Sequence, residues 1–62
     1  MKMMIKTKFH TFTMGIQSQN DFKFEVEVAK ETYLDMGAHL HATCYCIDEK
    51  SGEILEQVEV RV

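Results

Sequence analysis

The strongest pattern in the chain is a strict alternation of apolar and charged residues from Phe22 to Val28, which read Phe-Lys-Phe-Glu-Val-Glu-Val. Neighbouring side chains of a strand point to opposite faces, so this alternation predicts a strand with one apolar and one charged face. The residues from Val58 to Val62 repeat the pattern. We therefore predict strands over roughly 22–30 and 53–62.

Two further strands are predicted over roughly 3–14 and 38–47, which are rich in threonine, aromatic and aliphatic residues. Polar residues from Gly15 to Asp21 predict one turn, and Asp48 to Gly52 predict a tight turn closed by a left-handed glycine. Residues 30–37 fit a loop or a short helical turn near 32–36. The predicted fold is all-β, a single domain over 1–62 with a small four-stranded antiparallel sheet made of hairpins 3–14/22–30 and 38–47/53–62.

The faces of these strands predict a register and a core. Pairing Phe9 with Val26, and Cys46 with Ile54, places the apolar side chains on one face of the sheet. A bare apolar face of about 500 Å² would be at the limit that a monomer tolerates. The sheet should therefore close as a small barrel or pack in a homodimer or larger homo-oligomer. The predicted core comprises Ile5, Phe9, Phe22, Phe24, Val26, Val28, Leu40, Ala42, Cys44, Cys46, Ile54, Val58, Val60 and Val62.

Composition and charge restrict the cellular compartment and the classes of partner that we expect for the protein. The 62 residues carry a formal charge of −3, which disfavours phosphate binding and makes nucleic acid a poor partner. No apolar run approaches the eighteen or so residues of a membrane span, and lysines interrupt the N-terminal residues too early for a signal peptide. We expect a soluble protein in a reducing cytoplasm, that of the host cell if a phage encodes it, with no membrane partner.

The cluster from His39 to Cys46 contains two histidines and two cysteines, the residue types that bind zinc. Strand alternation places His39 and His41 on the face opposite Cys44 and Cys46, so four ligands cannot converge without a bulge. We predict free core thiols with no disulfide, no metal and no other cofactor. No catalytic motif is present, and we predict that the protein is not an enzyme.

Protein binding is the function that remains. Aromatic residues and methionines outside a core are typical of interfaces. We predict a small non-catalytic module that regulates or inhibits a partner by occupying its surface, as a phage or mobile-element accessory protein does to a host defence protein. The predicted partner-binding residues are Tyr33, Leu34, Met36, Phe12 and Tyr45.

Two other hypotheses follow from different residues. An oligomer could bind a small ligand, such as a nucleotide, between subunits through His39, His41 and Arg61. Alternatively, Lys6, Lys8, His10 and Phe12 could bind single-stranded nucleic acid weakly through charge and stacking.

Overall fold

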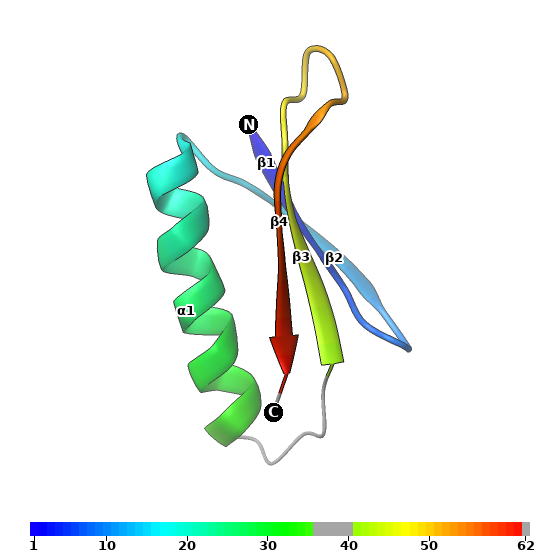
Figure 1. Cartoon of the computed structure of the whole chain (residues 1–62), viewed down its shortest axis with the longest axis vertical. Coiled ribbons are helices and arrows are strands. Elements are labelled where there is room, and N and C mark those ends of the chain that lie inside the picture. The colour runs from blue at the N-terminus through cyan, green and yellow to red at the C-terminus, as the bar shows by residue number, and fades with distance from the viewer. Residues whose placement is uncertain (36–40, 62) are drawn as a thin grey trace.

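The computed structural model describes residues 1–35 and 41–61, with residues 33–35 described by their backbone only. A four-stranded antiparallel sheet carries one helix on one of its faces, and the sheet is not closed (Figure 1). The strands lie in the order β2-β1-β3-β4. The elements along the chain are β1 (Lys2–Lys6), β2 (Thr11–Gly15), α1 (Gln19–Asp35), β3 (His41–Ile47) and β4 (Ile54–Arg61).

The first hairpin is formed by β1 and β2, which replace the single strand predicted over 3–14. A turn at residues 7–10 separates them, in which the Thr7 amide donates to the His10 carbonyl at 2.8 Å. The Thr7 hydroxyl oxygen accepts from the His10 amide at 2.9 Å and donates to its carbonyl at 3.0 Å. A threonine side chain can close a turn without glycine or proline. The predicted long strand is wrong for this reason.

A helix stands where the strand 22–30 was predicted. Ser18 caps it, because its hydroxyl accepts from the Asp21 amide at 3.3 Å while the Asp21 carboxylate accepts from the Gln17 amide at 3.1 Å. This exchange resembles a capping box, in which a serine and an acid three residues later bind the free amides of the first turn. The predicted pairing of Phe9 with Val26 is therefore wrong. Residues 32–35 of the predicted helical turn 32–36 form the end of a helix that begins at Gln19, and Met36 lies outside the described residues.

The second hairpin joins β3 and β4 within the predicted segments 38–47/53–62, of which residues 38–40 and 62 lie outside the described part. Gly52 has the predicted positive φ, at 75°, and its amide donates to the Asp48 carbonyl at 2.7 Å. The register differs by two residues, since Cys46 pairs with Glu56 rather than Ile54, and an irregularity follows between Cys46 and Ile47. The shift of two keeps the pairs from His41–Arg61 to Cys46–Glu56 on their predicted faces, whereas the irregularity pairs Ile54 with Ile47 instead of a core-facing residue.

The core lies between the sheet and α1. In the helix Phe22, Val26 and Ala29 are buried, and their spacing of four and three places them on one side of α1. Because the chain covers its apolar sheet face with its own helix, a barrel is not needed, and the predicted closed barrel is wrong. Packing in a homo-oligomer stays a prediction. The buried cluster consists of Met3, Ile5, Phe22, Val26, Ala29, Ala42, Cys44, Cys46 and Val60.

Four residues of the predicted core are on the surface instead. Phe9 lies in the turn between β1 and β2 and is 75% exposed. Phe24 and Val28 lie away from the buried side of α1, because a helix turns by about 100° per residue. Ile54 opens β4 at the hairpin and is 53% exposed. The predicted residues Leu40 and Val62 lie outside the described residues.

Candidate functional site

The most apolar surface hollow lies between the helix and the edge strand β2, and we call it the α1–β2 groove. Phe12 and Met14 of β2 pair with Ile5 and Met3 of β1, so they share the face that α1 covers. The helix lies closest to β3 and β4 and leaves β2 uncovered. The groove has a volume of about 230 Å³, and Phe12, Met14 and Val28 line it at the surface, all of them 38–48% exposed.

Exposed apolar side chains extend from the groove along the surface of α1. Phe24 precedes Val28 by one helical turn and is 67% exposed, so the two side chains are neighbours on the surface of α1. Glu25 also lines the groove, and Thr32 closes its far end. The site is therefore a strip of two phenylalanines, a methionine and a valine bordered by an acid.

A second groove lies on the other side of α1, against β4. It has a volume of about 350 Å³ and is lined by Lys23, Glu27, Lys30, Glu56 and the edges of core residues. Lys30 and Glu27 form an ion pair of 3.2 Å within it. Charged side chains therefore border this groove over a floor of Phe22, Val26 and Val58, whereas mainly apolar side chains border the α1–β2 groove.

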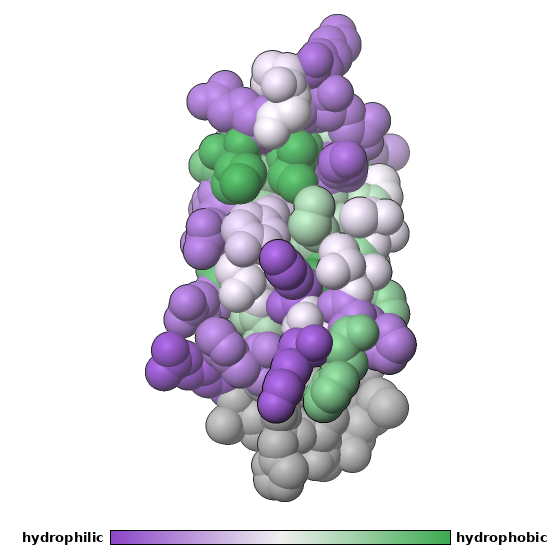
Figure 2. Space-filling view, turned by 90° about the vertical axis from the view of Figure 1, so that its right-hand side faces the viewer, coloured by the Kyte–Doolittle hydropathy of each residue, from purple (hydrophilic) through white to green (hydrophobic). Residues whose placement is uncertain are grey.

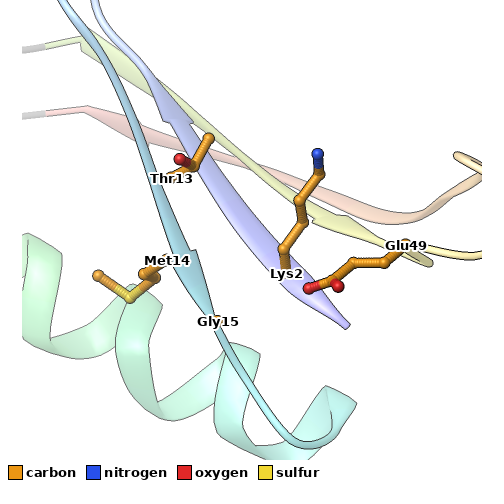
Figure 3. A pocket seen from close by; sticks show the side chains of 5 residues that line it. All are labelled: Lys2, Thr13, Met14, Gly15 and Glu49. Carbon is orange, nitrogen blue, oxygen red and sulfur yellow. The ribbon is translucent and has the colours of Figure 1, made fainter.

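A wide and shallow hollow of about 430 Å³ lies beside the ends of β1 and β2 (Figure 3). Figure 3 shows the ammonium group of Lys2 pointing away from the Glu49 carboxylate, and Met14 directed toward α1. Glu49 instead lies 3.9 Å from the N-terminal amine. Polar groups do not converge here as they do in a ligand site.

The open face of the sheet, opposite α1, is mostly hydrophilic or neutral (Figure 2). A compact hydrophobic patch interrupts it toward the end that carries the β3–β4 turn. Ile54 and Leu55, both exposed, belong to that end of β4. Tyr45 of β3 is half-buried and pairs with Met4 of β1 on this open face.

The structure separates the predicted partner-binding residues. Phe12 faces the helix side of the sheet, whereas Tyr45 faces the open side. Tyr33 and Leu34 belong to the last turn of α1, and Met36 lies outside the described residues. Of the two members of the predicted set whose side chains are described, Phe12 lines the α1–β2 groove and Tyr45 does not.

Two residues of the predicted small-ligand site, His41 and Arg61, lie beside the Glu59 carboxylate. His41 Nε2 lies 3.6 Å from a Glu59 carboxylate oxygen, and the Arg61 guanidinium lies 3.3 Å from the same oxygen. His39 lies outside the described residues. His41 and Arg61 are paired on β3 and β4, as the hairpin register requires.

The predicted nucleic-acid residues also lie on different surfaces. Lys6 belongs to the open face of the sheet, while Phe12 belongs to the helix side. Lys8 sits over the Phe9 ring at 5.7 Å, and the His10 ring lies 5.8 Å from that of Phe12. Three of the four predicted nucleic-acid-binding residues, Lys8, His10 and Phe12, are thus already engaged in aromatic contacts within the chain.

Both cysteines are free and buried on the helix-facing side of β3, as predicted. Burial raises the pKa of the Cys44 thiol, an effect that the positive charge of Lys30 partly opposes. Burial also raises the pKa of Cys46, with a further rise from Glu56 and an opposing effect of the N-terminal amine. Among residues 1–32 and 41–61, whose side chains are described, no three histidines, cysteines or acids are grouped to hold a metal ion.

We expect the buried thiols to make stability fall at alkaline pH. An unfolded thiol ionises near pH 8.5, whereas both folded thiols keep their protons to higher pH. The unfolded chain therefore binds fewer protons above that pH, so the free energy of unfolding declines until the folded pKa is passed, by at most about 1.4 kcal/mol per pH unit for each thiol. Urea unfolding between pH 7 and 10 measures the decline, and Cys44→Ala with Cys46→Ala should flatten it. An unchanged slope in that double variant would contradict the assignment.

Sequence reasoning missed Met14, Phe24 and Val28 as surface residues of a site. The missed signal is Ser18-Gln-Asn-Asp21, a serine followed three residues later by an acid, directly before the apolar run. Starting a helix there places Phe22, Val26 and Ala29 on the buried side. Phe24 and Val28 then remain as a separate exposed pair.

No helix in the described part of the chain is long and apolar enough to cross a membrane. Comparison with known protein families, with curated proteins and with solved structures found no match for this chain.

Proposed function

We propose that this protein is a non-catalytic protein-binding module that acts through the α1–β2 groove. The observation that carries the proposal is the exposure of Phe12, Met14 and Val28 around that groove, which Phe24 continues along the surface of α1. Together these side chains leave roughly 350 Å² of apolar surface in water, within the range of the largest patch on a typical monomer. Patches of that size are often functional, and phenylalanine and methionine are enriched in protein interfaces.

The chemistry of the remaining residues supports binding over catalysis. The two thiols lie in the covered layer with raised pKa values, which disfavours the thiolate that a nucleophile requires. His41 faces the open side of the sheet and is paired with Glu59. Among the described residues, His41 and the two thiols thus lie on opposite faces of the sheet and do not meet as nucleophile and base.

In its narrower form, the proposal is regulation or inhibition by occupation of a partner's surface. A chain of 62 residues with one apolar groove can cover a site on a larger protein. An accessory protein of a phage or mobile element that blocks a host defence protein would act in this way. Self-association through the same groove is the competing use of the surface.

Affinity capture from a lysate of the source cell, with groove variants as comparison, tests the proposal. Phe12→Ser and Met14→Ser should each lose a stoichiometric partner that the wild-type protein retains. Ile54→Ser is the matched control, because Ile54 is an equally exposed apolar residue away from the groove, and it should keep the partner. A partner retained equally by all variants would refute the groove as the binding surface.

A further inference from the structure

The sheet is wider than the helix that covers it. Four strands spaced by about 4.8 Å span roughly 15–19 Å with their side chains, whereas one helix covers about 10 Å. Because α1 lies closest to β3 and β4, the uncovered strip falls over β2, whereas Met3 and Ile5 of β1 are buried. The width of the strip is about 5–9 Å, so one more helix packed beside α1 would lie over β2 and extend past the edge of the sheet.

The strip has the surface that a second helix needs. Ile5 and Ala29 form its buried floor, and Phe12, Met14 and Val28 rise around it. These side chains come from strands and a helix of the folded core, so the groove is preformed. Apolar residues at helical spacing on a partner would fill it, as in other helix-in-groove complexes.

The charge on the α1 side of the groove is negative, because Glu25 is the charged residue among those described that lines it. Both lysines of α1, Lys23 and Lys30, line the opposite groove against β4. Among the ion pairs between described residues, none involves Glu25, so its charge is available to a partner.

We propose that the α1–β2 groove binds a basic amphipathic helix of a partner protein, an inference that rests on the proposed function and names its ligand. The apolar side of the partner helix packs on Phe12, Met14 and Val28, and its lysines or arginines face Glu25. A second copy of this chain is disfavoured as occupant, because its own α1 is committed to its own sheet. Two copies would also bring acidic helix flanks together in a protein of net charge −3.

Three labelled helical peptides of about 16 residues test the proposal by fluorescence anisotropy, at a length that gives roughly four turns. The first carries leucines at helical spacing with flanking lysines, the second the same leucines with glutamates, and the third the composition of the first in scrambled order. We expect the basic amphipathic peptide to bind at least about tenfold more tightly than either other peptide, a difference in the range of one interfacial charge pair plus apolar packing.

Two charge variants locate the binding. Glu25→Lys should abolish the preference for the basic peptide over the acidic one. Glu27→Lys makes the same charge change on the β4 side of α1 and should leave the preference intact. Phe12→Ser should weaken the basic peptide at least about tenfold, as loss of a central aromatic anchor does, and circular dichroism should show that it remains folded.

Several results would overturn the inference. Equal binding of the scrambled peptide, or equal effects of Glu25→Lys and Glu27→Lys, would mean unspecific attraction to an acidic protein. A wild-type dimer in light scattering that Phe12→Ser converts to a monomer would make a second copy the occupant. Loss of captured partner in Phe12→Ser without binding of the basic peptide would refute the helical ligand alone, whereas retention of the partner in Phe12→Ser would refute the proposed function itself.

Discussion

Replacing Phe22 by alanine is expected to lower the free energy of unfolding by about 3–5 kcal/mol, the usual cost of removing a phenylalanine from a core. Phe22 is fully buried in the cluster between α1 and the sheet. A domain of this length has a total stability of roughly 3–9 kcal/mol, so the variant should lose at least about a third of it. Urea unfolding followed by circular dichroism measures the loss.

Phe24→Ala is the matched control, because the same substitution two residues away should change stability by less than about 0.5 kcal/mol. Phe24 is 67% exposed and leaves no cavity when truncated. A strand over these residues would place both phenylalanines on one face and make the two variants equally costly. Comparable losses in Phe22→Ala and Phe24→Ala would therefore contradict the helix.

Truncation of Met3 is expected to have the second largest effect, about 2–5 kcal/mol for Met3→Ala. Met3 is completely buried and lies between Met14 of β2 and Cys46 of β3. Its neighbour Met4 points to the open face and is half-buried, so Met4→Ala should cost about 1 kcal/mol or less. Thermal unfolding of the two variants compares them, and a larger loss for Met4→Ala would place β1 in the opposite orientation.

The second hairpin could be predicted because its signals are local. In the structure the Asp48 side chain accepts a hydrogen bond inside the turn, and Gly52 adopts the positive φ that the turn needs. The Lys50 amide donates to the Asp48 carboxylate at 3.0 Å, an aspartate turn that competes well with extended backbone. The register was harder to predict, because a shift of two residues preserves the faces and costs the apolar pattern nothing.

The helix could not be predicted from alternation alone. Apolar residues at 22, 24, 26 and 28 satisfy a strand at every position, whereas a helix uses only two of them and adds Ala29. Tertiary packing decides between strand and helix, because the apolar face of the sheet is covered by the buried side of α1. The candidate groove exists only if residues 22–28 are helical, because it is bordered by apolar side chains that the packing of α1 leaves exposed. Phe12 was predicted as a binding residue because strand alternation placed its aromatic ring outside the core, whereas Met14, Phe24 and Val28 required the fold.

The sheet order β2-β1-β3-β4 has a consequence for how the protein folds. The β1–β2 and β3–β4 hairpins each join segments that are close in the chain, while the seam between β1 and β3 joins Lys2–Lys6 to residues separated from them by the whole of α1. Closing that long loop costs chain entropy before any seam pair is formed. We therefore expect the two hairpins to form early and independently, and docking of one on the other to limit the folding rate.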